Sequence, residues 1–291
     1  MSFDLSSITL DGSATAAEFS RRFKEHGIVL VRGFLPETRI RLWRDQIGQI
    51  LAARIRALGG DPPAGADMDE ALSVLMRLVD NGGMDIIRVV KDLPLFFQTL
   101  SDPDILRIVG SCLGTDMIQV VHDIAQFRID PPEYYVRNFG WHQDYQYNVT
   151  SLEAAVVWFP LTDIAEDMGP LHIVPGSHHD LLPVEYDTSG HVPGKGTTHS
   201  VFRLCVDEEE MERRCIPLTG IRSGDVAVFD SLLVHRSGIN TGRRARWVVN
   251  PRFGKLLDPA VVERGWLTMR DRTTDAFMRV HPDKVRTPSG S

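Results

Sequence analysis

The first part of the chain repeats apolar residues with the period of an α-helix. Apolar side chains recur every three or four positions, and Gly27 follows the first such stretch, where a glycine commonly ends a helix. The β-branched run 28–31 predicts a strand between the first two helices. The predicted helices are 15–27, 36–58, 68–100 with an interruption near 81–83, and 103–113.

The pattern changes after Gly114, where short runs of β-branched and aromatic residues alternate with Gly, Pro and Asp turns. Many short strands with such turns are typical of a sandwich or a closed barrel. A segment at 183–217 has little periodicity, and long irregular segments in compact domains are often lids or surface loops. The predicted strands lie within 117–129, 154–161, 171–174, 200–205, 225–229 and 246–253.

No Pro- or Ser-rich linker separates the helical part from the β part, and the chain has no internal repeat. We therefore expect a single domain over residues 1–291. In it, residues 1–113 form a mostly helical support, residues 114–254 form the β core, and residues 255–291 form a C-terminal extension.

The composition narrows the class of protein. A formal net charge of −7 over 291 residues disfavours a nucleic-acid-binding protein. The three cysteines show no CxxC spacing, so neither a zinc ribbon nor a disulfide framework is indicated. No signal peptide begins the sequence and no apolar stretch is long enough to span a bilayer, which predicts a cytoplasmic protein without membrane partners. The oligomeric state cannot be inferred from the sequence.

Three residues form a possible metal-ligand set. His142 and Asp144 lie two positions apart in FGWHQDYQY, a spacing that places both on one face if the segment is a strand. His235 follows the apolar run VAVFDSLLV, which we expect to be a strand. Two histidines and one carboxylate occupy three positions of an iron(II) octahedron and leave three for O₂ and a chelating co-substrate. An HxD pair alone is common, so this set needs further support.

That support comes from Arg246, eleven residues after His235. The stretch HRSGINTGRRARWVVNPRF predicts a strand, a turn at 240–242 and a returning strand that begins near Arg246. A guanidinium at that position can bind a carboxylate through two hydrogen bonds beside the metal. Arg243, by contrast, fits a solvated basic turn, and for Arg244 both a solvated turn and a carboxylate contact are open.

These motifs together resemble the phytanoyl-CoA dioxygenase family of iron(II)/2-oxoglutarate oxygenases. HQD, WFPLTD…GPLHIVPGSHH and GDVAVFDSLLVHRSG…R occur in the family's order over about residues 115–254, and HGIVLVRGFL is similar to its N-terminal strand. The resemblance implies a mainly β fold with flanking helices: a double-stranded β-helix (jelly-roll, cupin-like) core behind an N-terminal helical region. It also implies that His142, Asp144 and His235 hold the iron.

The resemblance assigns further residues to the co-substrate. Arg246 matches the arginine that binds the distal carboxylate of 2-oxoglutarate, and Gln126 stands where family members contact that co-substrate. Trp158 matches a tryptophan that lines the same pocket, and Ser237 is a further possible donor to the carboxylate. Other histidines are assigned structural positions, among them His172 and the turn residues His178 and His179. We also expect Asp230 to accept hydrogen bonds from turn amides.

The implied activity is that of an iron(II)- and 2-oxoglutarate-dependent dioxygenase. It would use O₂ to hydroxylate an unactivated C–H bond of a small-molecule metabolite and release succinate and CO₂. Related halogenases lack the carboxylate ligand, so Asp144 favours hydroxylation, whereas desaturation, cyclisation and epimerisation use the same ligands. No segment identifies the substrate. Arg88, Arg137 and Arg252 are hypothetical partners for an anionic group on it.

Two alternatives use the same residues differently. A zinc hydrolase can employ a His/Asp/His set with an activated water, but has no use for Arg246 or Gln126. A non-catalytic jelly-roll binding protein can keep the fold, although three converging polar side chains are costly to bury without a metal.

Overall fold

The computed structural model describes residues 4–65, 67–79, 83–122, 124–133, 140–186, 191–192, 196–197, 202–266 and 274–286. Arg137 therefore lies outside the described residues.

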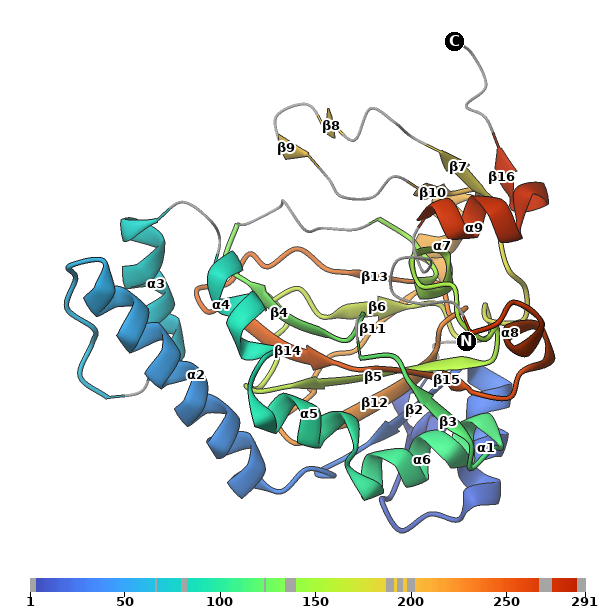
Figure 1. Cartoon of the computed structure of the whole chain (residues 1–291), viewed down its shortest axis with the longest axis horizontal. Helices are drawn as coiled ribbons and strands as arrows, with labels where there is room; N and C mark the ends of the chain where they lie inside the picture. The colour runs from blue at the N-terminus through green and yellow to red at the C-terminus, as the bar shows by residue number, and fades with distance from the viewer. Residues whose placement is uncertain are drawn as a thin grey trace.

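An eight-stranded sheet forms the centre of the molecule (Figure 1). Its strands follow the order β1-β2-β12-β5-β14-β4, and β15 joins β3 to β5. The strands are β1 (Thr9–Leu10), β2 (Ile28–Val31), β3 (Ile118–Val120), β4 (Gln126–Asp130), β5 (Ala154–Pro160), β12 (Val226–Asp230), β14 (Arg246–Asn250) and β15 (Arg252–Lys255).

A second sheet packs against one face of the first. It has the order β11-β6-β13, with β6 (Leu171–Ile173), β11 (Ile216–Pro217) and β13 (His235–Ser237). Leu171 and Ile173 of this sheet share an apolar cluster with Val156, Trp158 and Val248 of the large sheet. Two sheets packed in this way confirm the mainly β, double-stranded β-helix fold. At one end lie a third sheet, β10-β7-β16, of Phe202–Leu204, Val184–Tyr186 and Val285–Arg286, and the pair β8 (His191–Val192) and β9 (Gly196–Thr197).

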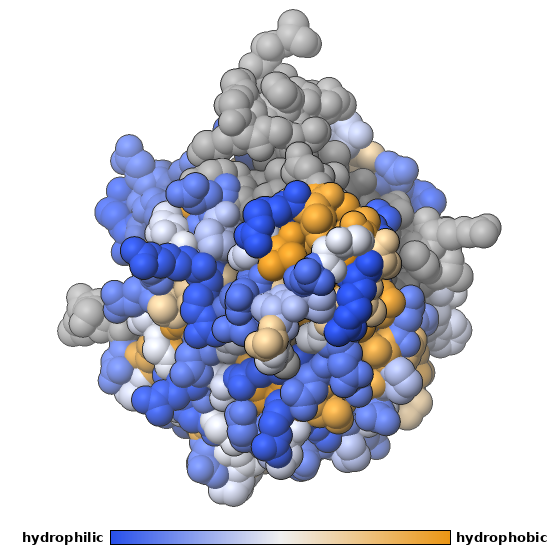
Figure 2. All heavy atoms as spheres, turned by 90° about the vertical axis from the view of Figure 1, so that its left-hand side faces the viewer, coloured by the Kyte–Doolittle hydropathy of each residue, from blue (hydrophilic) through white to orange (hydrophobic). Residues whose placement is uncertain are grey.

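Helices cover the other face of the large sheet (Figure 1). Because successive residues of a strand point to opposite faces, Val157 and Phe159 of β5 pack against the helices, while Val156 and Trp158 point between the sheets. From the side of α2 and α3 the surface is mostly hydrophilic, with smaller apolar patches (Figure 2). These helices are α1 (Ala16–His26), α2 (Glu37–Ala57), α3 (Met68–Leu78), α4 (Met84–Val90), α5 (Pro94–Leu100) and α6 (Pro103–Leu113).

The N-terminal helices confirm the predicted pattern. Thr15 and Glu18 form a capping box at the start of α1, and Gly27 ends the helix with a φ of 75°. The predicted helical region 68–100 consists of α3, α4 and α5. Short helices lie later in the chain: η2 (Asp144–Tyr147), α7 (Glu208–Arg214), α8 (Pro259–Glu263) and α9 (Thr274–Val280).

Two predictions around His235 were wrong. The apolar run before it is not one strand, because β12 ends at Asp230 and a turn follows in which the Leu232 amide donates to the Asp230 carboxylate over 2.8 Å. Residues 235–250 are also not a hairpin, because β13 pairs with β6 while β14 pairs with β4 and β5. The chain crosses between the two sheets here, which local turn signals do not reveal.

The segment 183–217 is more regular than its sequence suggested, since its described residues include β7, β10, α7 and β11. Among all described residues, no helix is both long and apolar enough to cross a bilayer.

Candidate metal centre

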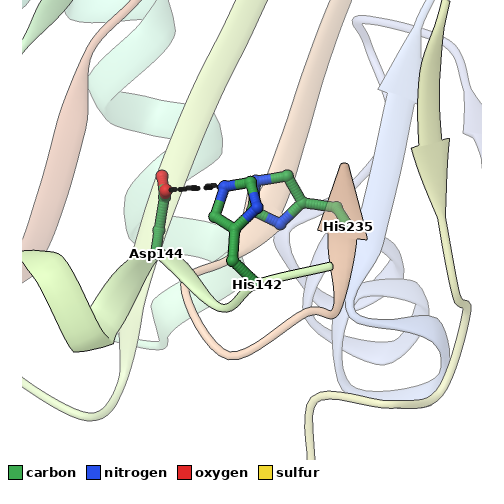
Figure 3. Close-up of side chains that lie close together, drawn as sticks. All are labelled: His142, Asp144 and His235. Carbon is green, nitrogen blue, oxygen red and sulfur yellow. Dashed lines mark ion pairs between the residues drawn. The ribbon is translucent and has the colours of Figure 1, made fainter. Parts of the chain in front are cut away.

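His142, Asp144 and His235 come together between the two sheets (Figure 3). All three side chains are buried, and one possible ligand atom from each lies within 4.8 Å of the others. The Nε2 atoms of His142 and His235 lie 3.7 Å and 3.9 Å from Oδ1 of Asp144. The structure thus brings together the three residues that the sequence singled out.

Backbone pairing joins the two distant histidines. The amide of each donates to the carbonyl of the other over 3.0 Å, forming an antiparallel bridge beside β13. The expectation that His142 and Asp144 share a strand face was wrong, because Asp144 begins the 3-10 helix η2. The turn into η2, rather than strand alternation, directs the carboxylate towards the imidazoles.

Gln143, between the two ligands, anchors this turn and was not recognised from the sequence. Its side chain is fully buried, and Nε2 donates to the carbonyls of Asp180 and Leu232 over 2.8 Å and 2.6 Å. Its Oε1 accepts from the amide of Leu182 over 3.0 Å. The available signal was a polar residue at the centre of the HQD motif.

The orientation of both imidazoles suits a metal. Nδ1 of His142 lies 2.8 Å from the Gly140 carbonyl, and Nδ1 of His235 lies 2.8 Å from the Leu233 carbonyl. A carbonyl can only accept, so each Nδ1 carries the hydrogen and each Nε2 presents its lone pair to the centre. Carbonyl partners of this kind fix the tautomer of metal-binding histidines.

The protonation states also suit a metal. Burial lowers the pKa of His142 to about 3, with the neighbouring His235 acting in the same direction. Burial likewise lowers the pKa of His235. Burial alone would raise the pKa of Asp144, but Arg252 and the two histidines outweigh it and lower that pKa to about 2. At neutral pH the set consists of two neutral imidazoles and one carboxylate, the forms that bind metals.

Arg252 pairs with one of the three possible metal ligands. Its Nε and Nη2 lie 3.0 Å and 2.8 Å from Oδ2 of Asp144, and its Nη1 donates to the Ile124 carbonyl over 2.8 Å. These contacts pair the guanidinium with Asp144, and the hypothesis that Arg252 binds an anionic substrate group stays untested. Arg88, on α4, does not line the metal cavity.

A cavity of about 250 Å³ opens beside two of the three ligands, His142 and Asp144. Gln126, at the start of β4, lines it, and its contact with the co-substrate stays a prediction. The lining residues are Gln126, Arg128, His142, Asp144, Tyr147, Asn148 and Arg252.

Arg246 lies between the sheets, and only two of its three guanidinium nitrogens donate hydrogen bonds among the described residues. It is 2% exposed, and its Nε and Nη2 donate to Oδ2 of Asp130 over 3.2 Å and 2.9 Å. Nη1 is buried and has no hydrogen-bond partner among the described residues. An unpaired buried donor is costly, and a ligand carboxylate would satisfy it. Arg246 does not line the cavity beside the metal ligands, and its contact with 2-oxoglutarate stays a prediction.

Trp158 and Ser237 do not line the cavity beside the metal ligands. Trp158 is 4% exposed within the apolar cluster between the sheets and does not line the metal cavity. Ser237 is half-buried on β13, two residues after His235, and lines a different cavity of about 730 Å³ together with His172 and Arg236.

Comparison with known proteins agrees with this geometry. Residues 23–248 match the phytanoyl-CoA dioxygenase family. The chain is 23% identical to a probable phytanoyl-CoA dioxygenase of Caenorhabditis elegans, over 80% of this chain and 73% of that protein. It is 22% identical to the peroxisomal phytanoyl-CoA dioxygenase of Homo sapiens, over 84% and 70% of the two chains.

Solved structures share the fold. EctD from S. alaskensis with bound Fe superimposes with a TM-score of 0.55 at 19% identity, covering 83% of this chain and 77% of that one. The epimerase SnoN, in complex with Fe3+, alpha ketoglutarate and nogalamycin RO, gives 0.54 at 15% identity, covering 82% and 83%. The family match extends over most of the chain and includes the metal-ligand set. The chain therefore belongs to the phytanoyl-CoA dioxygenase family of non-haem iron(II)- and 2-oxoglutarate-dependent oxygenases.

Proposed function

We propose that this oxygenase hydroxylates an unactivated C–H bond of a small-molecule metabolite and releases succinate and CO₂. The observation that carries the proposal is the joint arrangement at the centre. Two imidazole Nε2 atoms face one oxygen of Asp144, and the same barrel holds an arginine with an unpaired buried Nη1. A metal and a dicarboxylate account for both features.

Each ligand has a defined task in this proposal. His142, Asp144 and His235 hold iron(II) through two Nε2 atoms and Oδ1, and leave three positions of an octahedron open. Iron with 2-oxoglutarate and O₂ supplies the oxidising chemistry, while the protein supplies geometry and excludes water. Phe229, a member of the apolar cluster around Trp158, packs against the His235 imidazole with ring centroids 4.9 Å apart.

The co-substrate residues remain proposals as well. Arg246 Nη1 donates to the distal carboxylate of 2-oxoglutarate, while Asp130 keeps the guanidinium in place through Nε and Nη2. Gln126 contacts the co-substrate from the cavity wall. Trp158 supports the same pocket from within the barrel, and Ser237 adds a hydroxyl donor from β13.

We propose hydroxylation as the outcome because Asp144 occupies the position that a halide would need. The structural relatives include an epimerase and a carbocyclase, so the same fold also serves other outcomes. A structure of EctD contains 2-oxoglutarate and 5-hydroxyectoine, a small hydroxylated molecule. We propose a substrate of comparable size, because the cavity beside the ligands is about 250 Å³. We also propose that residues 1–291 act as one domain in the cytoplasm.

The test is anaerobic addition of iron(II) and then 2-oxoglutarate to the metal-free protein, followed by visible spectroscopy. We expect a weak metal-to-ligand charge-transfer band that is absent in His142→Ala and retained in His172→Ala. Succinate release on admitting O₂ with candidate metabolites then identifies the substrate. Iron binding without the band, or a hydrolytic activity independent of O₂ and 2-oxoglutarate, would instead support a zinc hydrolase or a binding protein.

A further inference from the structure

Arg252 and Asp144 form an ion pair in which the two carboxylate oxygens have different neighbours. Both Nε and Nη2 of Arg252 contact Oδ2, at 3.0 Å and 2.8 Å. The imidazole Nε2 atoms of His142 and His235 instead lie 3.7 Å and 3.9 Å from Oδ1. One oxygen thus faces the arginine and the other faces the histidines.

Arg252 is itself held firmly. It begins β15, where it pairs with Val156 of β5, and its side chain is 8% exposed. Its Nη1 donates to the Ile124 carbonyl over 2.8 Å, so the guanidinium is anchored at both ends. Asp144 is the first residue of the 3-10 helix η2. Because Arg252 has a backbone anchor at Ile124 that does not depend on Asp144, its guanidinium can fix the position of the carboxylate.

We propose that Arg252 is a positioning residue that restricts Asp144 to a single metal-binding oxygen. A free carboxylate can bind a metal through one or both oxygens, and the second oxygen would occupy another coordination position. 2-Oxoglutarate needs two of the three positions that the protein leaves open, and O₂ needs the third. By holding Oδ2, Arg252 keeps that third position available. The inference rests on the proposed function, because it requires a metal on the three ligands.

Loss of Arg252 should affect metal binding and 2-oxoglutarate binding differently. Removing Arg252 also removes a positive charge beside a metal dication, so we do not expect the metal to be lost. The released Oδ2 would compete with 2-oxoglutarate for a coordination position. Loss of a residue that orients a metal ligand typically costs ten- to a hundredfold in affinity or activity. We expect about a tenfold rise in the 2-oxoglutarate dissociation constant at saturating metal in Arg252→Met.

The experiment uses Mn(II) as the probe and counts the water molecules bound directly to it, from water-proton relaxation. The variants are Arg252→Met, which keeps length without charge, and Arg252→Lys, which can still bind one oxygen. Arg39→Ala is the matched control, because Arg39 pairs with the buried Asp102 away from the metal. Circular dichroism and thermal unfolding confirm that each variant is folded.

We expect Arg252→Met to bind Mn(II) with fewer inner-sphere waters than the wild type, and Arg252→Lys to restore the number. Arg39→Ala should match the wild type in water count and in 2-oxoglutarate affinity. An unchanged water count together with unchanged 2-oxoglutarate affinity in folded, Mn(II)-loaded Arg252→Met would overturn the positioning proposal alone. If wild type and His142→Ala bound Mn(II) equally, both the metal centre and the inference would be wrong.

Discussion

Arg246 and Asp130 occupy directly paired positions on β14 and β4 and share one hydrogen-bonded ion pair inside the barrel. Asp130 also accepts from Arg128 over 3.0 Å. Burial raises the pKa of Asp130, but the guanidinium groups of Arg128 and Arg246 outweigh it and hold that pKa well below its usual range. Asp130 is thus ionised between two cations and leaves one donor of Arg246 for a ligand.

Arg246→Ala should weaken 2-oxoglutarate binding without unfolding the protein. Asp130 would keep its contact with Arg128, so no carboxylate would be left without a cation. A hydrogen bond to a charged group contributes about 1.5–3 kcal/mol, so we expect the dissociation constant to rise roughly ten- to a hundredfold. Titration of the charge-transfer band at saturating iron(II) measures this constant.

Arg244→Ala provides the control for that measurement. Arg244 lies two residues earlier, is exposed, and binds Asp69 over 2.7 Å. Its removal should leave 2-oxoglutarate binding unchanged. Equal losses in the two variants would mean that Arg246 has no direct contact with the co-substrate.

Gln143→Ala should lower both stability and metal affinity. The side chain makes three hydrogen bonds to the backbone of Asp180, Leu182 and Leu232 while fully buried. Leaving such partners unsatisfied costs about 1–3 kcal/mol per group, so loss of the three bonds should destabilise the protein by at least about 3 kcal/mol. The turn between His142 and Asp144 would also loosen, which should weaken Mn(II) binding about tenfold.

Urea unfolding and Mn(II) titration measure these two effects, with exposed Gln98→Ala as the control. Gln143→Glu should be the more damaging change, because a second acceptor would face two backbone carbonyls. Normal stability in Gln143→Ala would contradict the anchoring role.

Much of the fold followed from local patterns, because each amphipathic helix carries its own period and caps. Thr15, Glu18 and Gly27 define α1 from within a short stretch of sequence. The crossing between sheets at 235–246 did not follow, since turn residues describe a local bend and not which strand becomes the neighbour. The pairing of β13 with β6 depends on contacts made some 60 residues away in the sequence.

At the site, too, residue types could be predicted from the sequence, but long-range pairing could not. His142, Asp144, His235 and Arg246 were recognisable because metal and carboxylate binding require these residue types. Arg252 was noticed for its charge but assigned to the substrate, because a sequence does not show which carboxylate a guanidinium meets. Its pairing with Asp144 spans 108 residues and depends on β15 lying beside β5.

The metal-free protein should lose stability as the pH falls below about 6.5, the usual pKa of histidine. Burial lowers the pKa of His142 to about 3 and that of His178 to about 4, and also lowers that of His235. The unfolded chain therefore binds more protons than the folded chain in this range, so acid favours unfolding. Each histidine that stays neutral when folded should cost about 2 kcal/mol between pH 7 and pH 5.

Urea unfolding at the two pH values measures this difference, and His142→Gln should reduce it because the variant cannot take up that proton. Equal pH dependence in the wild type and His142→Gln would show that His142 takes up its proton over the same pH range in the folded protein as in the unfolded chain. Asp230 opposes the trend, because its pKa is shifted in the other direction.

Asp230→Asn should stabilise the protein most at pH 8 and less than half as much at pH 5. Burial raises the pKa of Asp230 from 3.8 to about 7, and no ion pair with it is present among the described residues. Its Oδ1 accepts from the Leu232 amide, and the carboxyl lines a cavity of about 460 Å³. The other titratable residues of that cavity are Lys24, Cys112, Glu153, His178 and His179.

The sign follows from the raised pKa. The folded chain retains a proton that the unfolded chain loses, so the contribution of Asp230 to stability is greatest below pH 3.8 and is lost as the pH rises through about 7. At pH 8 the folded state holds a buried charge at a cost of up to about 4 kcal/mol. An asparagine keeps the acceptor for the Leu232 amide and removes that cost.

Thermal unfolding at pH 5 and pH 8 measures the difference in stability between Asp230→Asn and the wild type. Asp225→Asn is the contrasting variant, because Asp225 accepts a hydrogen bond from Arg32 over 2.7 Å. This variant should be less stable than the wild type at both pH values. Destabilisation of Asp230→Asn at pH 8 would mean that a cation compensates its carboxylate in solution.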